Sequence, residues 1–177
     1  MPHYDLDQGI ARENLSRLLA ACYYQPGPEF AEEKVFDTML AAATRIHPEL
    51  AAYARRLGED FSAESHEGLL LDYTRLFLGP SHIIAAPYGS VWLEGEKIVM
   101  GDSTIAVVEL YREGDFDMSE EFRELPDHIA AELEFLYLLI YRENEAHRNG
   151  QPEALQAKAD LRKRFLDRHL GRWVEPF

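Results

Sequence analysis

The chain has 177 residues, of which 46% are hydrophobic, a length and composition that suit one folded domain and exclude a disordered chain. Its 18 basic and 32 acidic residues give a net charge of −14, and this charge repels phosphate backbones and anionic lipid, so nucleic acid and membrane surfaces are poor candidate partners. A cationic partner would be attracted, although acidity alone also keeps a cytoplasmic protein in solution.

The cysteine content and the first residues indicate a reducing compartment. Cys22 is the single cysteine, so the chain cannot form an internal disulfide or a cysteine metal cluster. The first residues, MPHYDLDQGIARENL, lack the basic start and apolar run of a secretory signal. The longest uncharged run, residues 76–93, contains proline and glycine and is more typical of a loop than of a membrane span. We expect a cytoplasmic protein.

Three helices are predicted in the first third of the chain. Apolar residues at helical spacings between residues 11 and 23 predict a first helix with Asp7 as its cap, and Pro26-Gly27-Pro28 ends it. A second helix is predicted from residue 29 to 45. A short third helix is predicted from Pro48, because a first helical turn tolerates a residue that has no N–H.

Two further helices flank a long loop. A fourth helix is predicted over residues 65–78, and Gly79-Pro80 is a strong signal for its end. The loop that follows runs to residue 101. A fifth helix is then predicted from a cap at Asp102 or Ser103 to Gly114.

The most acidic part of the chain contains the strongest helical pattern. Residues 109–150 carry 12 acidic and four basic residues. Within them, residues 112–125 are predicted to form an acidic connector with room for one helical turn. A sixth helix is predicted from an N-cap at Asp127 to Gly150, and its nearly continuous apolar surface predicts the central, most buried helix. The apolar stripe of this helix consists of Ile129, Leu133, Leu136 and Ile140. A seventh, amphipathic helix is predicted over residues 152–169.

These elements predict an all-α fold. We expect a single-domain helical bundle over residues 1–177, with about seven main helices, one long loop and an acidic connector. The alternation that marks strands is almost absent, and residues 90–100 are the one stretch that could pair as a short hairpin.

The sequence contains no motif that would support catalysis or a metal site. Glu-x-x-His, His-Glu-x-x-His, Gly-x-Ser-x-Gly and phosphate-binding loops do not occur. His128 and Glu132 are four residues apart and could share one metal ion, but two ligands are too few. Taken alone, Asp127 is better explained as an N-cap and His128 as an exposed first-turn residue. We therefore expect no catalytic residues and no metal.

Other features favour a binding module. The loop SHIIAAPYGSVWLEGE contains Pro87, Tyr88 and Trp92, the helix before it ends in LFLGP, and the acidic helix start follows it. An apolar groove with carboxylates at its edge would suit a peptide that is partly hydrophobic and partly basic. The alternative is that Tyr88 and Trp92 only hold the loop against the bundle.

Four blocks resemble the TorD/DmsD family of redox enzyme maturation chaperones, in the same order. The blocks are DYTRLFLGP at 72–80, APYGSVWLE at 86–94, VVELYREGDF at 107–116 and LPDHIAAELEFLYLL at 125–139. The resemblance implies an all-helical, non-catalytic protein of the cytoplasm. It also implies that the protein binds the twin-arginine signal peptide, or the apo form, of a molybdopterin oxidoreductase of the dimethyl sulfoxide reductase class until the cofactor is inserted.

Two alternatives stay open beside this reading. The first is a chaperone for a non-exported molybdoenzyme subunit such as that of a nitrate reductase, and the second, more distant one is a hydrolase that uses Asp127 and His128. The resemblance implies no cofactor of the chaperone itself. Weak guanine-nucleotide binding has been proposed for some family members, but no motif here supports it. Some relatives form domain-swapped dimers, so a monomer or a swapped homodimer with a hinge at residues 112–125 is expected.

The resemblance also assigns site residues. The expected signal-peptide contacts are Leu76, Phe77, Gly79, Pro80, Pro87, Tyr88, Ser90, Asp127 and His128. Trp92 joins them as a further apolar surface, and Tyr88 stands where some relatives have tryptophan. A twin-arginine peptide carries two guanidinium groups ahead of an apolar segment, so its binding site needs carboxylates beside a hydrophobic groove. The expected acidic residues are Glu124 and Glu132, with Asp115, Asp117, Glu120 and Glu121 of the connector. We expect His128 to orient the Asp127 carboxylate or to contact peptide backbone.

Overall fold

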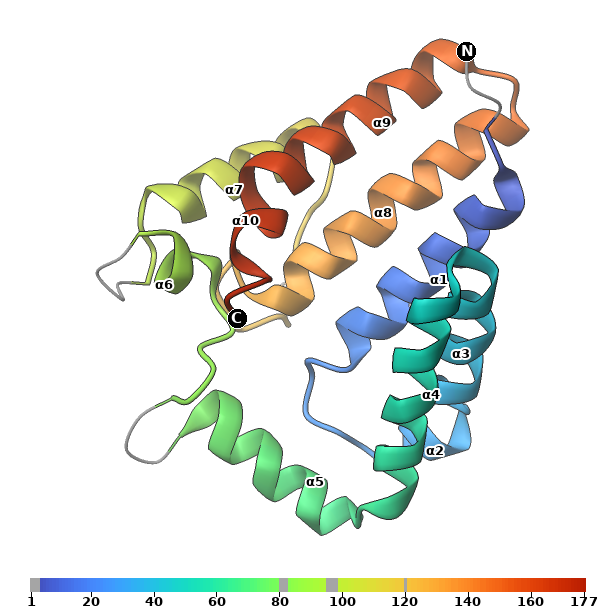
Figure 1. The fold of residues 1–177 in the computed structure, drawn as a ribbon. Helices are drawn as coiled ribbons and strands as arrows, with labels where there is room; N and C mark the ends of the chain where they lie inside the picture. Colours follow the sequence, from blue (N-terminus) through green and yellow to red (C-terminus); the bar gives the residue numbers. More distant parts are fainter. Residues whose placement is uncertain (1–3, 80–82, 95–98, 120) are drawn as a thin grey trace.

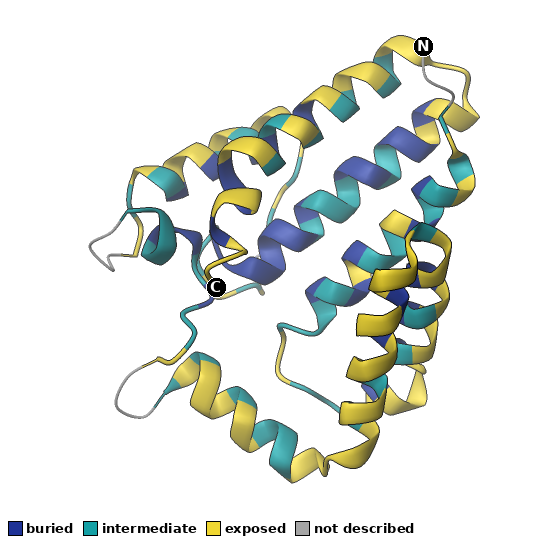
Figure 2. Cartoon of the chain, viewed as in Figure 1, coloured by how far each residue is buried: buried dark blue, intermediate teal, exposed yellow. Residues whose placement is uncertain are grey.

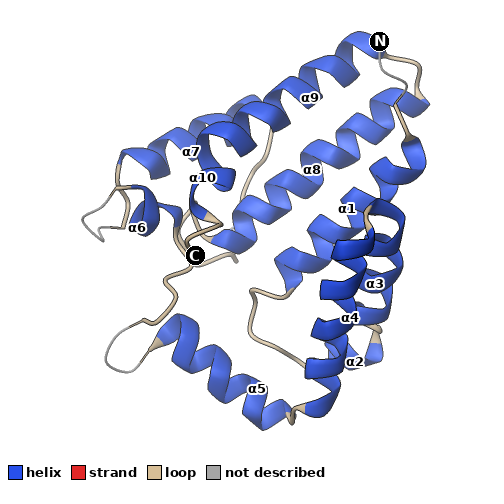
Figure 3. Cartoon of the chain, viewed as in Figure 1, coloured by secondary structure: helices blue, strands red, loops and turns tan. Residues whose placement is uncertain are grey.

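The computed structural model describes residues 4–79, 83–94, 99–119 and 121–177. In these ranges every regular element is a helix, and the single β-type pairing is an isolated antiparallel bridge between Tyr88 and His128 (Figure 3). The predicted all-α fold class is therefore confirmed.

The helices follow one another along the chain, with long connections between residues 78 and 89 and between residues 113 and 129. They are α1 (Leu6–Ala21), α2 (Glu29–Glu32), α3 (Val35–Ile46), α4 (Pro48–Ala63), α5 (His66–Tyr73), α6 (Gly89–Leu93), α7 (Asp102–Glu113), α8 (Ile129–Arg148), α9 (Pro152–Phe165) and α10 (Gly171–Trp173). Two π-helical turns, η1 (Thr74–Leu78) and η2 (Leu166–Leu170), continue α5 and α9. None of the described helices is both long and apolar enough to span a bilayer.

Helix α8 is the centre of the fold, as its apolar surface predicts. It runs between α1 and α9 and packs along both (Figure 1). Phe135 and Leu139 of α8 are fully buried, and Val107 of α7 and Phe165 of α9 are buried against them. Burial removes these apolar side chains from water, and α8 contributes more buried apolar residues than any other described helix.

A second apolar cluster joins α1 to the helices that follow it. Leu18 of α1, Phe30, Met39 and Ala54 are buried together where α1, α2, α3 and α4 meet. Helix α1 therefore contacts both clusters and links the two parts of the molecule.

Helix α5 differs from the other long helices because it buries none of its residues. It lies at the edge of the molecule and is largely exposed (Figure 2). Its neighbour η1 holds it to the body through aromatic contacts: Phe77 lies 6.0 Å from Tyr23 and 5.2 Å from Tyr73, measured between ring centroids. Apolar spacing in this segment thus predicts the helix but not its burial.

Several predicted helix boundaries are wrong. The second predicted helix is interrupted at Lys34, whose φ of 51° is left-handed, so α2 and α3 are separate. The predicted short third helix is α4, with 16 residues. Helix α1 is capped by Asp5, which accepts a hydrogen bond from the Gln8 N–H, and not by Asp7.

The hairpin that residues 90–100 could have formed is not supported, and the predicted cap of the fifth helix is wrong. Residues 89–93 form α6, and residues 95–98 lie outside the described part of the chain. The N-cap of α7 is Gly101, and Glu94 supplies the capping oxygen by accepting the Ser103 N–H at 2.7 Å. Between residues 114 and 125, the described residues contain no helix.

Candidate functional site

The loop before α6 pairs with the start of α8. The Gly89 N–H donates to the Asp127 carbonyl at 2.8 Å, and the Ile129 N–H donates to the Pro87 carbonyl at 2.8 Å. These bonds form the bridge between Tyr88 and His128. The two sequence blocks expected to share a site therefore lie side by side.

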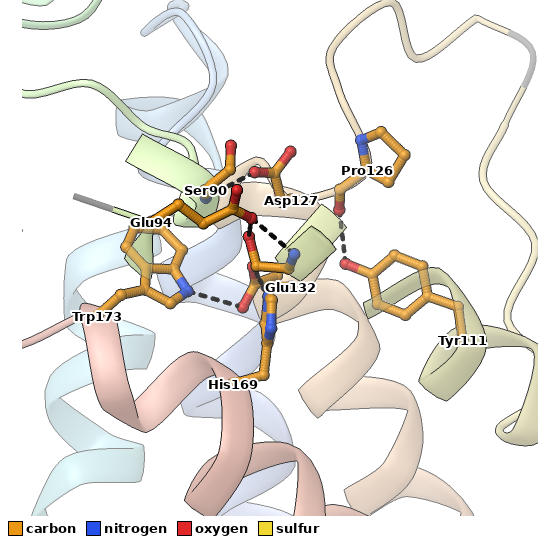
Figure 4. Close-up of polar contacts among 9 residues, drawn as sticks. Ser90, Glu94, Tyr111, Pro126, Asp127, Glu132, His169 and Trp173 are labelled. Atoms are coloured by element: carbon orange, nitrogen blue, oxygen red, sulfur yellow. Dashed lines mark hydrogen bonds and ion pairs between the residues drawn. The ribbon is translucent and has the colours of Figure 1, made fainter. Parts of the chain in front are cut away.

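Asp127 fixes this loop from a fully buried position. Its Oδ2 accepts the Ser90 N–H at 2.8 Å, so the carboxylate caps the first turn of α6 (Figure 4). The predicted role of Asp127 as the N-cap of α8 is wrong. Within the described residues, Asp127 Oδ1 and Ser90 Oγ have no hydrogen-bond partner. Ser90 is fully buried as well.

His128, not Asp127, caps α8. Its Nδ1 accepts the Ala130 N–H at 3.1 Å, and the residue is 5% exposed, so the interpretation of His128 as an exposed first-turn residue is also wrong. Burial lowers the pKa of His128, an effect that Glu124 and Asp127 partly offset. The ring lies edge-on to Tyr88 at 5.4 Å and to Phe122 at 5.9 Å. No hydrogen bond joins the described side chains of His128 and Asp127.

A buried polar network lies beneath the loop, one turn further along α8. Glu132 is fully buried, with one oxygen 2.8 Å from His169 Nε2 and the other accepting the Trp173 Nε1–H at 3.1 Å (Figure 4). Burial raises the pKa of Glu132 to about 7, although both hydrogen bonds oppose this rise. Glu132 therefore joins α8 to η2 and α10, and it does not reach the surface as part of an acidic edge.

Gly89 allows the loop to lie directly on this network. A Cβ at this position would lie 2.9 Å from Trp173 Nε1 and 3.1 Å from Glu132 Oε1. Nearby, the Tyr111 hydroxyl donates to the Pro126 carbonyl at 2.8 Å and holds the chain that enters α8. No local sequence signal indicates the roles of His169 and Trp173, because their contact with Glu132 joins distant parts of the chain.

The accessible side of the bridge is aromatic and acidic. Tyr88 is half-buried, and its hydroxyl donates to Glu124 Oε2 at 2.6 Å. Burial, together with this hydrogen bond, raises the pKa of Tyr88, so the phenol is neutral at neutral pH. Glu124 itself is exposed. A carboxylate and an aromatic ring are thus both available to a partner at this point.

An aromatic cluster lies on the other side of the loop. Its members are Tyr23, Tyr73, Phe77, Trp92, Trp173 and Phe177, joined by ring contacts with centroid separations of 5.2–6.4 Å. The Trp92 indole N–H donates to the Ala86 carbonyl at 2.8 Å. Leu76 is exposed beside the cluster, and Gly79, with a φ of 48°, closes η1. Pro80 lies outside the described residues.

A groove runs between the end of α1, the connector and α8. Two adjoining hollows of about 300 and 370 Å³ share Tyr24, Phe116 and Glu134 as lining residues, and we call this surface the connector groove. Asp117 and Glu121 line the first hollow. The Tyr24 hydroxyl donates to Glu134 Oε1 at 2.5 Å. No sequence motif selects Tyr24 or Glu134 as site residues.

Other expected acidic groups differ in accessibility. Asp115 lies 3.5 Å from Arg142 Nη1, so its charge is partly compensated, and Glu120 is outside the described residues. A larger hollow, about 700 Å³, lies between α3 and α4 and is lined by none of the expected site residues. In the described part of the chain, no group of three or more His, Cys, Asp or Glu side chains is placed to hold a metal ion.

Comparisons with known proteins agree with the predicted resemblance. A family model described as "Nitrate reductase delta subunit" matches residues 37–177. The chain is 32% identical over 117 residues to the Tat proofreading chaperone DmsD of Salmonella typhimurium, covering 66% of this chain and 56% of the relative. It is 27% identical over 147 residues to the chaperone protein TorD of Aliivibrio salmonicida, covering 82% of this chain and 67% of the relative.

Two further similarities extend this comparison. A selenate reductase assembly chaperone protein of Thauera selenatis is 39% identical over 71 residues, which cover 40% of this chain and 36% of the relative. A crystal structure assigned as a redox enzyme maturation protein from Archaeoglobus fulgidus matches with a TM-score of 0.50 and 26% identity, covering 89% of this chain and 94% of that chain.

The aligned part of the chain spans about half the length of the DmsD relatives. The curated relatives are named as chaperones and not as enzymes, which agrees with the predicted non-catalytic family. The family model covers most of the chain, and the curated matches have the same character. The chain therefore belongs to the nitrate reductase delta subunit family, which includes the TorD and DmsD chaperones.

Proposed function

We propose that this protein is a cytoplasmic maturation chaperone that binds the twin-arginine signal peptide of a molybdopterin oxidoreductase and holds the enzyme until its cofactor is inserted. The observation that carries this proposal is the contact between Tyr88 and Glu124 at the bridge to α8. It places an accessible carboxylate beside an aromatic face, the combination that an arginine followed by apolar residues requires. The relatives named as a Tat proofreading chaperone and a selenate reductase assembly chaperone support it.

The arginine side chains of the peptide would bind to exposed carboxylates. Glu124 lies at the bridge, and Asp117, Glu121 and Glu134 line the connector groove. Guanidinium groups bind carboxylates through paired hydrogen bonds, and the excess negative charge of the molecule would speed their encounter. The connector groove therefore adds accessible acidic groups that substitute for the buried Glu132.

The apolar part of the peptide would bind along η1 and the loop before α6. Leu76 is 39% exposed, and the rings of Phe77 and Trp92 lie within the neighbouring aromatic cluster. Apolar side chains that leave water at this surface would supply most of the favourable free energy of binding.

Asp127, Ser90 and His128 would act mainly by positioning these contacts. Asp127 and Ser90 are fully buried, and each keeps one polar atom that has no partner among the described residues. A small displacement of the loop would allow Asp127 Oδ1 to accept a hydrogen bond from the peptide, since a carboxylate accepts several. The three residues thus fix the Tyr88 bridge in the free protein and offer polar contacts to a bound peptide.

A hydrolase that uses Asp127 and His128 has no support in this geometry. Asp127 Oδ2 accepts from the Ser90 N–H, His128 Nδ1 accepts from the Ala130 N–H, and both side chains are buried, so each is held by backbone and turned away from solvent. A catalytic base must be free to take a proton from a substrate within hydrogen-bonding reach. The two side chains are better suited to organise a binding surface.

A second candidate is a chaperone that binds the catalytic subunit of a non-exported enzyme. The description of the matching family names a nitrate reductase subunit, and this observation favours the alternative. The two candidates differ in the part of the client that is bound. A signal peptide would suffice for the first, whereas the second requires the folded or partly folded apo subunit.

Calorimetric titration with a synthetic twin-arginine signal peptide tests the proposal. We expect the wild-type protein to bind it, and to bind a peptide with both arginines replaced by glutamine more weakly. Glu124→Gln should weaken binding by about twofold to fivefold, the size of an exposed ion pair. Glu109→Gln, at an exposed position of α7, removes the same charge elsewhere and should leave the affinity unchanged. If the wild-type protein does not bind the signal peptide, the proposal is wrong.

A further inference from the structure

The Phe177 side chain lies among aromatic rings from several elements. Its centroid is 5.8 Å from that of Tyr23, which follows α1, and 6.4 Å from that of Phe77 in η1. It is 5.9 Å from Trp92 of α6 and 5.4 Å from Trp173 of α10. Edge-to-face and tilted pairs at these separations are favourable. The pocket, defined by these four residues, accepts an apolar ring.

Among the described residues, few contacts besides those of this ring hold residues 174–177. Val174, Glu175 and Pro176 are exposed, and the Phe177 N–H donates to the Trp173 carbonyl at 3.2 Å. Val174 bonds back to Leu170 in the same way. These are local bonds that would re-form after a small rotation of the segment. Release of Phe177 would therefore mainly require breaking its ring contacts.

The pocket coincides with the surface expected to bind the apolar part of a client. Phe77 and Trp92 were selected from the sequence as peptide contacts, and both touch Phe177. We propose that the Tyr23, Phe77, Trp92 and Trp173 pocket is a subsite for an apolar side chain of the client peptide, and that Phe177 occupies this subsite in the free protein. This inference rests on the proposed function, because it names the apolar subsite of that peptide site.

Charge favours the client over the protein's own segment. Glu175 lies next to the pocket on an exposed segment, in a molecule whose net charge is −14. A signal peptide that carries arginines ahead of its apolar residues is attracted to the same surface. A cationic peptide can thus replace an acidic segment that offers a similar ring.

Competition of this kind sets the apparent affinity. The apparent affinity for a ligand is the intrinsic affinity multiplied by the fraction of molecules in which the site is free. Removing the Phe177 ring should therefore tighten client binding, although it also removes apolar contacts from the protein itself. This opposite effect on binding and on packing distinguishes a displaceable group from an ordinary core residue.

The test compares Phe177→Ala with Val174→Ala, a control on the same segment at an exposed position. The probe is a synthetic signal peptide with two arginines and a leucine- and phenylalanine-containing segment. We expect Phe177→Ala to bind it about threefold to tenfold more tightly than wild type, the size of one aromatic contact. Val174→Ala should match wild type. A peptide with serine in place of the apolar residues should show no difference between Phe177→Ala and wild type.

Intrinsic fluorescence reports on the same pocket. The chain has two tryptophans, and both contact Phe177. Phe177→Ala should shift their emission to longer wavelength in the free protein, and addition of the peptide should reverse the shift. Phe177→Leu keeps an apolar group in the pocket, so it should give intermediate values and covers the case in which Phe177→Ala folds poorly.

The possible results separate this inference from the proposed function. If Phe177→Ala is folded by circular dichroism and binds the peptide no more tightly than wild type, the inference is overturned while the proposed function stands. If no form binds the peptide, the proposed function fails, and the apolar dye N-phenyl-1-naphthylamine decides the inference. Dye binding by Phe177→Ala that is lost in Phe177→Ala/Trp92→Ala supports the pocket, and equal binding by wild type and Phe177→Ala overturns it.

Discussion

Asp127 and Glu132 are fully buried carboxylates with different tasks. Asp127 holds a backbone N–H of the next element, Ser90 in α6, whereas Glu132 bonds side chains of η2 and α10. A buried carboxylate is stable only when hydrogen bonds replace its contact with water. Both residues therefore contribute to the shape of the site through neighbours that are distant in the sequence.

Substitution of Asp127 should lower the unfolding free energy, and the loss should be larger when no hydrogen-bond acceptor remains at this position. Asp127→Ala leaves the buried Ser90 N–H without its acceptor, which should cost about 1–3 kcal/mol of unfolding free energy. Asp127→Asn keeps an oxygen in place and should lose less. Urea denaturation of the two variants measures this difference, and equal stability of Asp127→Ala and wild type would contradict the assigned contact.

Glu132 should make stability depend on pH. The folded protein holds the Glu132 proton more tightly than the unfolded chain, since burial raises the pKa from 4.5 to about 7. This contribution to stability is fully present below about pH 4.5 and is lost as the pH rises through about 7. The loss is at most about 3 kcal/mol, from 1.36 kcal/mol for each pKa unit.

The matched variant for this effect is Glu132→Gln, which keeps an acceptor for Trp173 and cannot ionise. Urea denaturation at a series of pH values between 4.5 and 7 should give a flatter profile for Glu132→Gln than for wild type. Parallel profiles for the two proteins would show that Glu132 does not titrate in this range.

At the scale of elements, the site depends on how α6 lies on α8 and α10. Helix α6 has only five residues, and the Asp127 carboxylate supplies its cap from outside the helix. Gly89 brings it close enough for the Glu132 network to contact its backbone. The position of Tyr88 and Trp92 therefore follows from this close approach.

Gly89→Ala should disturb that approach. The new Cβ would lie 2.9 Å from Trp173 Nε1, so α6 or the indole must move, at a cost of about 1–3 kcal/mol. Gly68→Ala in α5 is the control, because its Cβ would meet only the flexible side chain of Glu64 and Ser65 Oγ. Thermal unfolding should show a lower midpoint for Gly89→Ala alone. An unchanged midpoint would mean that α6 does not pack as described.

Local sequence signals predicted the elements better than the contacts between them. The apolar stripe of α8 identified the central helix, because the spacing of its residues reflects burial directly. The break at Lys34 was missed, because a left-handed lysine has no sequence signal comparable to that of glycine. The preference of N-cap positions for aspartate predicts Asp127 as the cap of α8, but it does not reveal that His128 takes this place.

The sequence motifs predict which segments form the site, but they do not predict the long-range contacts within it. The motifs brought Pro87-Tyr88 and Asp127-His128 to one place, and the bridge between them confirms that they are neighbours. Burial of Glu132 was not predicted, because an acidic residue on a helix is usually solvated unless a distant partner compensates it. His169 and Trp173 are such partners, and only the fold brings them to Glu132.

At the scale of the whole molecule, α5 is the element with least support from the rest. It buries no residue, whereas α8 lies between α1 and α9 (Figure 1). Leu71 is one of the exposed apolar side chains of α5, and η1, which continues α5, contains Leu76 and Phe77 of the expected peptide contacts. We therefore expect the unfolding free energy to depend more on α8 than on α5.

Substitutions in α5 and in α8 should differ in their effect on the unfolding free energy. Leu71→Ser should change the unfolding free energy by no more than about 0.5 kcal/mol, since its side chain is half exposed. Leu139→Ala in α8 removes a fully buried side chain and should cost about 2–5 kcal/mol. Denaturant titration measures both, and similar losses for the two variants would contradict the exposed position of α5.

The central claim is that the protein is a chaperone for a molybdopterin oxidoreductase. Its most direct test is affinity capture of the tagged protein from the cytoplasm of its native cells, followed by mass spectrometry of the bound chain. We expect the apo form of a molybdopterin oxidoreductase, captured by the wild-type protein and less by Glu124→Gln. Recovery of no molybdopterin enzyme by the wild-type protein would contradict this account.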